Sequence, residues 1–375
     1  MKKLFRGLLG LTAASVLASC GGSAAPAASP SAAPSSPVAS AKPTSASPAV
    51  ASSAAPASAK PAAASAPASA AAASQGAGKK LRVGLSVAES FDVLPVYVAQ
   101  SIGSWSKRGL DVEVSGFNGA AGLMQAMAAN SVDIGFGSSD GASNAIIKGS
   151  PMKIVAEDLP SIGLFVLITG SDSGVSAVDD LKGKTIGVTS HGSITEVLGL
   201  ELARSKGWTA GKDLQIATIG GLSEQAAALK RHQTAGFNWT AEAGYQLEER
   251  GEGKILLSYG SVLKDFESAM IEVTDQASKK DPDAIKAFLQ GQSEAVKYLQ
   301  ANKDQAVQIG ASKIGVSPTV AAKTYDLVAK EFSSDGVISR AKLQAVLDVE
   351  VAHGLVDKSA ANVDALVDPQ YAGLK

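Results

Sequence analysis

Short apolar runs alternate with amphipathic stretches from residue 79 to the end of the chain. Short apolar runs are typical of buried strands, whereas apolar residues three and four positions apart indicate one face of a helix. Strands are therefore predicted at 81–86, 110–114, 132–136, 152–157, 184–188, 214–219, 236–239, 254–257 and 269–273. Helices are predicted between them at 94–102, 122–129, 142–148, 195–205, 224–231 and 241–249.

The order of these elements predicts the fold class. Strands that alternate with helices form parallel sheets with helices on both faces. Because this pattern occurs twice, we predict an α/β fold of two doubly wound lobes with a hinge and an interlobe cleft. Lobe one is expected at 79–167 and 268–375, with a mainly helical C-terminal part, and lobe two at 168–267. The crossings at 158–169 and 261–269 are the expected hinge.

The first residues have the pattern of an export signal. Lys2, Lys3 and Arg6 precede a short apolar run that is well below the length of about 20 residues that a membrane span needs. The run ends in Leu17-Ala18-Ser19-Cys20, which resembles the lipobox of bacterial lipoproteins. That resemblance implies a signal peptide at 1–19, lipidation of Cys20 and an extracytoplasmic protein anchored to a membrane, in the periplasm or on the cell surface.

The segment 20–78 consists almost wholly of Ala, Ser and Pro. It lacks the large apolar side chains that offset the entropy of ordering, so we expect a disordered tether. The chain's net charge is −1, and no basic block follows residue 6, which argues against nucleic acid as a partner. Cys20 is the single cysteine, which excludes an internal disulfide and a cysteine metal cluster.

Four stretches resemble a known family. They are Val83-Gly84-Leu85 with Leu94-Pro95-Val96-Tyr97-Val98-Ala99 and the Gly109–Val114 segment, then Asn130-Ser131-Val132-Asp133-Ile134-Gly135, then Asp179-Asp180-Leu181-Lys182-Gly183-Lys184-Thr185-Ile186-Gly187, and Asp281-Pro282-Asp283-Ala284-Ile285-Lys286-Ala287-Phe288. In order and spacing they resemble type-II periplasmic binding proteins, in the group of sulfonate, taurine, nitrate and thiamine-pyrimidine-precursor receptors. The resemblance implies a monomeric receptor that delivers a small molecule to an ABC permease.

One stretch departs from that family. The segment from Arg231 to Trp239 resembles a strand of the second lobe but lacks the aspartate that this strand usually contains. After it, Thr240-Ala241-Glu242 replaces the frequent Glu-Pro. The ligand contacts of the second lobe, and with them the ligand class, therefore do not carry over from the family.

The candidate ligand site comes from the turns that follow the strands. In open parallel sheets, ligands bind beyond the carboxyl ends of the strands, where helix N-termini present N–H groups. The ligand-binding candidates are Ser90, Phe91, Asn118, Gly119, Ala120, Ser138, Ser139, Asp140, Ser190, His191, Gly192, Ser193, Asn238 and Trp239. Several also suit other roles: the Ser and Gly residues as caps and turns, His191 as an exposed turn residue, and Trp239 and Phe91 as packing.

The charges at these turns bear on the ligand. They are mostly acidic, at Glu89, Asp92, Asp140, Glu196 and Glu242, and arginine is absent. Because a sulfonate or carboxylate clamp usually uses arginine, we expect a planar nitrogen heterocycle somewhat more than a sulfonate or nitrate. The same acids also suit helix N-termini, which leaves this preference open.

Two other classes of function remain as alternatives. One is an enzyme on the same fold, of the pyrimidine-precursor or menaquinone-pathway type; the other is a ligand-sensing domain without transport. Only three histidines occur, His191, His232 and His353, and no metal-ligand spacing or Ser-His-Asp constellation is evident. The sequence therefore predicts a receptor without catalytic residues, metal or cofactor.

Overall fold

The computed structural model describes residues 78–373. The predicted signal at 1–19, Cys20 and the expected tether up to residue 77 lie outside the described residues. Within 78–373, no helix combines the length and apolar character needed to cross a bilayer.

The first sheet has the strand order β2-β1-β3-β10-β4 and defines lobe one. Its strands are β1 (Lys79–Leu85), β2 (Leu110–Gly116), β3 (Ile134–Ser138), β4 (Met152–Leu159) and β10 (Ala269–Thr274). β1 pairs in parallel with β2 and β3, whereas β10 runs antiparallel to both of its neighbours. The expected return of the strand at 269–273 to this lobe is confirmed, but the all-parallel sheet predicted from the strand order is wrong.

The second sheet, with the order β7-β6-β8-β5-β9, defines lobe two. Its strands are β5 (Phe165–Gly170), β6 (Thr185–Val188), β7 (Gln215–Thr218), β8 (Gly236–Thr240) and β9 (Gly253–Ser258). β5 was not predicted. It is buried along its whole length between β8 and β9 and antiparallel to both, so it lacks the polar alternation that marks a half-exposed strand.

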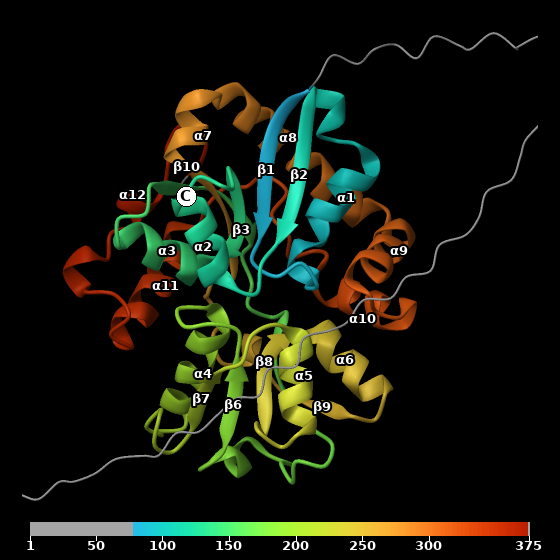
Figure 1. Cartoon of the computed structure of the whole chain (residues 1–375), viewed down its shortest axis with the longest axis vertical. Coiled ribbons are helices and arrows are strands. Elements are labelled where there is room, and N and C mark those ends of the chain that lie inside the picture. Colours follow the sequence, from blue (N-terminus) through green and yellow to red (C-terminus); the bar gives the residue numbers. More distant parts are fainter. Residues whose placement is uncertain (1–77, 374–375) are drawn as a thin grey trace, which may run out of the picture. The chain divides into compact units, whose positions relative to one another are not determined.

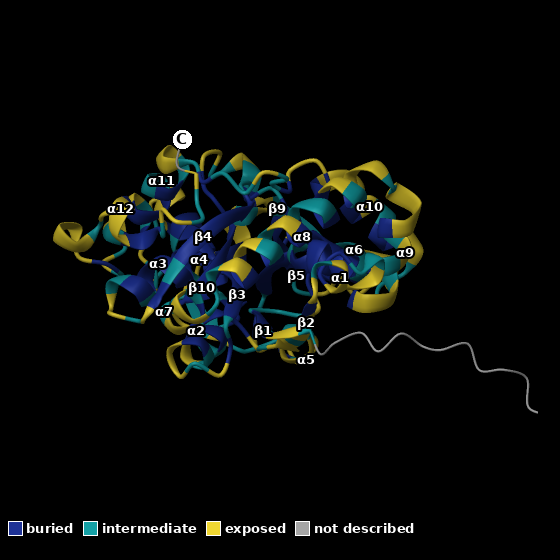
Figure 2. Cartoon of the chain, turned by 90° about the horizontal axis from the view of Figure 1, so that it is seen from above, coloured by how far each residue is buried: buried dark blue, intermediate teal, exposed yellow. Residues whose placement is uncertain are grey.

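Helices cover both sheets, as Figures 1 and 2 show, and the strands beneath them are the most buried elements. They are α1 (Leu94–Ile102), α2 (Ala120–Ala128), α3 (Ser139–Ile147), α4 (Ile194–Ser205), α5 (Leu222–Lys230), α6 (Ala241–Glu249), α7 (Asp275–Lys280), α8 (Pro282–Ala301), α9 (Lys303–Ile314), α10 (Pro318–Val328), α11 (Arg340–Ala352) and α12 (Val363–Leu366). Asp281 and Ser317 cap α8 and α10, each of which has proline in its first turn. The predicted α/β fold is confirmed.

The two sheets present the carboxyl ends of their parallel strands to each other. In Figure 1 the arrowheads of β1 and β2 point toward lobe two, and those of β6 and β8 point toward lobe one. The chain crosses between the lobes at 160–164 and again between β9 and β10. The first crossing is shorter than expected because β5 occupies residues 165–170. The exact division into 79–167 with 268–375 and 168–267 stays a prediction.

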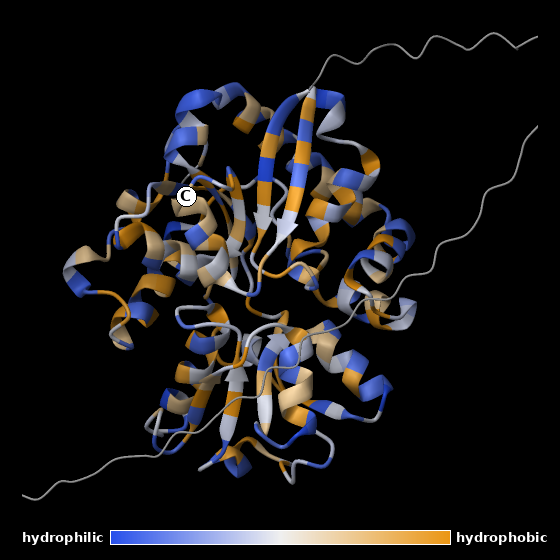
Figure 3. Ribbon diagram, in the orientation of Figure 1, coloured by the Kyte–Doolittle hydropathy of each residue, from blue (hydrophilic) through white to orange (hydrophobic). Residues whose placement is uncertain are grey.

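Burial follows each strand's position in its sheet. The edge strand β2 alternates between apolar and polar residues, visible as bands in Figure 3, and most of its residues are partly or fully exposed. β3 lies inside the sheet and is buried throughout. Trp105 is buried against α8: its ring stacks on Phe288 at a centroid distance of 4.8 Å, and its Nε1–H donates to the Phe288 carbonyl at 3.1 Å.

Replacing Trp105 with alanine should lower the free energy of unfolding by about 3–5 kcal/mol, because it removes a buried aromatic ring and leaves a cavity against Phe288. Trp208 is the matched control because it is only partly buried and lies near Lys206 at the surface. Urea denaturation of both variants checks the prediction, and equal losses for the two tryptophans would contradict it.

Candidate functional site

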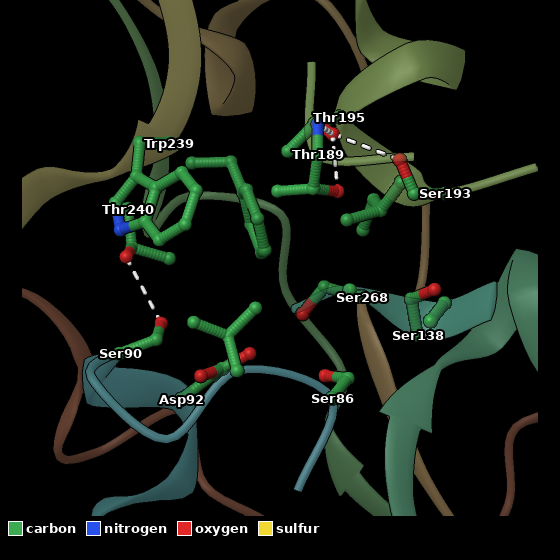
Figure 4. Close-up of a pocket in the computed structure, with 15 residues that line it drawn as sticks. Ser86, Ser90, Asp92, Ser138, Thr189, Ser193, Thr195, Trp239, Thr240 and Ser268 are labelled. Carbon is green, nitrogen blue, oxygen red and sulfur yellow. Dashed lines mark hydrogen bonds between the residues drawn. The ribbon is translucent and has the colours of Figure 1, made fainter. Parts of the chain in front are cut away.

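A cavity lies between the two lobes, where turns from both sheets meet (Figure 4). It encloses about 440 Å³ of empty space, part of which is open to solvent. Lobe one and the crossings contribute Ser86, Val87, Ser90, Asp92, Gly119, Ala120, Ser138 and Ser268, and lobe two contributes Phe165, Thr189, Ser193, Ile194, Thr195, Trp239 and Thr240.

The lining is rich in hydroxyl groups and poor in charge. Eight of its residues are serine or threonine, and Asp92 is the one ionisable side chain. Lysine, arginine and histidine are absent from this lining. Figure 4 shows Ser86, Ser90 and Asp92 on one side of the cavity, facing Trp239, Thr189 and Thr195 on the other. The site therefore offers hydrogen-bond donors, acceptors and flat apolar walls.

Four helices begin at this cavity. Gly119, Ser138, Ser193 and Thr240 are the N-cap residues of α2, α3, α4 and α6, and all four line it. The first turn of each helix carries N–H groups without intrahelical partners and a partial positive charge. Two helix N-termini in each lobe can therefore donate N–H groups to hydrogen-bond acceptors of a ligand in the cavity.

The lobes touch beside the cavity. The hydroxyls of Ser90 and Thr240 lie 3.0 Å apart, and the Phe91 N–H donates to Oε1 of Glu242 at 3.2 Å. Gly119 has a φ of 118°, and a Cβ built on it would lie 3.0 Å from the Ser190 hydroxyl. A side chain at Gly119 would therefore press on lobe two, so this position favours glycine for both its backbone angle and its space.

Two carboxyls lie at this contact: Glu242, which is buried, and Asp92, which is partly buried. Burial raises the pKa of Asp92 to about 6. Burial also raises the pKa of Glu242 to about 7, and the charge of Asp92 adds to that increase. Carboxyls with such pKa values change charge close to neutral pH.

Six of the residues predicted from the turns line the cavity: Ser90, Gly119, Ala120, Ser138, Ser193 and Trp239. They come from both lobes, so the structure brings together turns that are far apart in the sequence. Trp239 combines both roles considered for it, because its ring borders the cavity while it packs edge-on against Phe237.

The remaining predicted residues of lobe one surround the cavity without lining it. Phe91 is fully buried against Gly310 of α9, and Ser139 donates its hydroxyl to the Glu267 carbonyl. Asp140 is buried, and its charge contributes to the raised pKa of Glu350 in α11. Asn118 lies at the edge of the lobe contact, opposite Gly221.

In lobe two, Ser190 lies against Gly119, and Gly192 donates its N–H to Glu196 at 2.7 Å. His191 has 79% of its side chain exposed, with Nδ1 2.9 Å from Glu196, which matches the exposed-turn interpretation. Asn238 is fully buried; it donates to the Thr195 carbonyl at 2.8 Å and accepts the Tyr259 hydroxyl at 2.6 Å.

Sequence reasoning missed several lining residues. Phe165 and Ser268 come from β5 and from the second crossing, which the strand pattern did not connect to the cleft. Thr189 directly follows a predicted strand, so the same rule could have found it. The Thr195 hydroxyl accepts the Thr189 N–H at 2.9 Å and lies 2.9 Å from the Thr189 hydroxyl. This contact carries no signal in the sequence.

The described residues contain no group of three or more His, Cys, Asp or Glu side chains arranged to hold a metal ion.

Comparisons with known proteins show the family of this chain. The sequence model of the family described as "NMT1/THI5 like" matches residues 90–306, more than half of the chain. A curated Brucella abortus protein named "Putative binding protein" is 29% identical over 239 residues, which are 63% of this chain and 72% of that protein. The family resemblance seen in the sequence is confirmed.

Solved structures share the fold. An alkanesulfonate-binding protein, SsuA, from Xanthomonas axonopodis, bound to MOPS, aligns with a TM-score of 0.67 at 18% identity, over 77% of this chain and 98% of that chain. The periplasmic nitrate-binding protein NrtA from Synechocystis aligns with a TM-score of 0.64 at 17% identity, over 78% and 86%. At these identities the likeness shows the fold alone, a periplasmic binding protein fold.

The bond from Tyr259 to Asn238 should stabilise the β8 end of the cavity. Tyr259→Phe leaves Oδ1 of Asn238 buried without that donor and should lower the free energy of unfolding by about 1–3 kcal/mol. Tyr245→Phe is the matched control because that ring is partly exposed beside Lys323, and its change should stay within about 0.5 kcal/mol. Chemical denaturation measures both; a neutral Tyr259→Phe would refute the assigned bond.

Proposed function

This chain belongs to the NMT1/THI5-like family, and we propose that it is an extracytoplasmic solute-binding protein of an ABC-type importer. The observation that carries the proposal is the cavity between the lobes, to which each lobe contributes two helix N-caps and several hydroxyls. A ligand held by both lobes stabilises the closed arrangement, and the closed surface then docks on the permease.

The proposed ligand is a small planar nitrogen heterocycle with amino groups. Asp92 can accept hydrogen bonds from an amino group, and no lysine, arginine or histidine of the lining competes for it. Trp239 and Phe165 supply flat apolar walls, and the helix N-termini can donate to ring nitrogens or carbonyl oxygens. This combination suits a ligand that both donates and accepts.

A simple anion such as a sulfonate or nitrate is the second candidate. It is favoured by the four helix N-termini, since such ends bind anions through N–H groups and the helix dipole. The names of the structural relatives above also refer to alkanesulfonate and nitrate. Against it stands Asp92, whose carboxylate would repel an anion in the same cavity.

A ligand panel distinguishes the two candidates. Saturation at about 100 times the dissociation constant adds roughly 2.7 kcal/mol to stability, so a bound ligand raises the melting temperature. We expect aminopyrimidines to raise it more than taurine, nitrate or alkanesulfonates. Asp92→Asn should weaken aminopyrimidine binding by about tenfold or more, because a charge-assisted bond is lost. Glu89→Gln, an exposed acid in the same loop, should leave binding unchanged.

The opposite ranking of ligands would support the anion candidate and reject the heterocycle. Recovery of a chemically altered ligand after incubation with the purified protein would instead support an enzyme on this fold.

We also propose that Cys20 carries a lipid anchor, on the strength of the lipobox-like Leu17-Ala18-Ser19-Cys20. Because several acyl chains are needed for firm attachment, Cys20→Ser should move the protein from the membrane fraction to the soluble fraction of the expressing bacterium. Fractionation followed by immunoblotting measures this. A membrane-bound Cys20→Ser protein would contradict the proposal.

A further inference from the structure

Glu242 makes the principal polar contact between lobe two and the segment 90–92 of lobe one. It lies in the first turn of α6 and is 1% exposed. Its Oε1 accepts the Phe91 N–H at 3.2 Å and the hydroxyl proton of Thr240. The hydroxyls of Ser90 and Thr240 lie 3.0 Å apart, and the Ser90 hydroxyl also bonds to the Asp92 carboxylate. Oε1 of Glu242 thus accepts one donor from each lobe, the Phe91 N–H of lobe one and the Thr240 hydroxyl of lobe two.

The second oxygen of Glu242 is the unusual feature. Oε2 is buried without a hydrogen-bond partner, and so is Oδ1 of Asp92 on the opposite lobe. The two carboxyls interact electrostatically, because the charge of Asp92 raises the pKa of Glu242. A buried carboxylate oxygen without a donor is costly, whereas a protonated carboxyl carries no net charge into the contact.

Among residues 78–373, no lysine, arginine or histidine contributes to the shifted pKa of either carboxyl. On lobe one, Asp92 interacts electrostatically with Asp158 and Tyr97, and Glu89 lies in the same turn. On α6, Glu248 bonds to the Ile255 N–H and Glu249 to the Ser317 hydroxyl. The lysine of α10 that reaches α6, Lys323, lies over the Tyr245 ring. The groups that face the pair are therefore acidic or neutral.

We propose that Glu242 is a positioning residue that closes the cleft and that it must hold a proton to do so. The inference rests on the proposed function, in which closure captures the ligand. Opening the cleft returns Glu242 to water, where a glutamate ionises at its ordinary pKa of 4.5. Closure therefore takes up a proton in the interval between 4.5 and the closed-state pKa of about 7.

The sign of the pH dependence follows. A group whose pKa is higher in the closed state stabilises that state as the pH falls. The closed form should gain on the open form as the pH drops from about 7 toward 4.5, and Asp92, with a closed-state pKa of about 6, adds to the effect at the lower end. Above pH 8 the ionised pair disfavours closure.

The experiment measures lobe closure without any ligand. Cysteines introduced as Lys286→Cys on α8 and Lys212→Cys beside β7, both exposed, carry spin labels in the full chain with Cys20→Ser. Double electron–electron resonance gives the populations of the short and long interlobe distances. Between pH 7.5 and pH 5.5 the closed-to-open ratio should rise on the order of tenfold.

Glu242→Gln keeps an oxygen for Phe91 and Thr240 but cannot titrate, so its ratio should change far less between these pH values. Glu248→Gln, the same substitution on the exposed side of α6, should behave like the unsubstituted chain. The proposal is overturned if the closed-to-open ratio of the unsubstituted chain does not change with pH. It is also overturned if the Glu242→Gln variant keeps the full change of that ratio.

Asp92→Asn tests the same idea if Glu242→Gln does not fold. Removing the opposing charge should shift the rise in closure to lower pH, because the pKa of Glu242 falls, and an unmoved midpoint contradicts the proposal. Since these measurements use no ligand, they separate the two hypotheses. A failed ligand panel with pH-dependent closure rejects only the ligand class, and successful binding with pH-independent closure rejects only the role of Glu242.

Discussion

The joint between the two crossing segments is the constraint on which the cleft depends. Ser268 precedes β10, and its hydroxyl donates to the carbonyls of Leu159 and Ser161 at 2.9 and 2.8 Å, while its N–H donates to Leu159 at 3.1 Å. Ser268 of the second crossing is thereby hydrogen-bonded to the first crossing. Each crossing leads into an interior antiparallel strand, β5 or β10, so the core of each sheet holds one end of the joint. The carboxyl ends of the parallel strands are left facing each other across a narrow space lined by Ser268 itself.

That space is built from groups that stay neutral or change charge near neutral pH. Hydroxyls line it, helix N-termini open into it, and the nearby carboxyls of Asp92 and Glu242 have raised pKa values because burial withholds water from them. Such a site gives up the strong attraction of an arginine clamp. In return it can present both donors and acceptors, and its closure is tied to proton uptake. The proposed ligand site and the lobe contact therefore share residues, Ser90 and Thr240 among them.

The fold was accessible from the sequence where local rules apply. Short apolar runs and intervening amphipathic stretches mark most strands and helices, and the residues after a strand are the right place to look for a cleft. The rule failed at β5, because a strand buried on both faces has no polar alternation, and at Ser268, which lies in a crossing outside the strand-to-helix turns. The local sequence also does not show that β5 and β10 each run antiparallel to their neighbours in the sheet.

By itself, the sequence determined the α/β class, the repeated lobe pattern, the family and the turns from which Ser90, Gly119, Ser138, Ser193 and Trp239 reach the cavity. Those properties follow from side-chain periodicity and from where helices start, which are local. Only the tertiary structure decided that Phe91 and Asn238 turn into the core and that His191 faces solvent. It also decided that Asp92 of one lobe lies close enough to the buried Glu242 of the other lobe to raise its pKa. Burial and charge proximity depend on contacts between residues 150 positions apart, and composition and spacing do not encode such contacts.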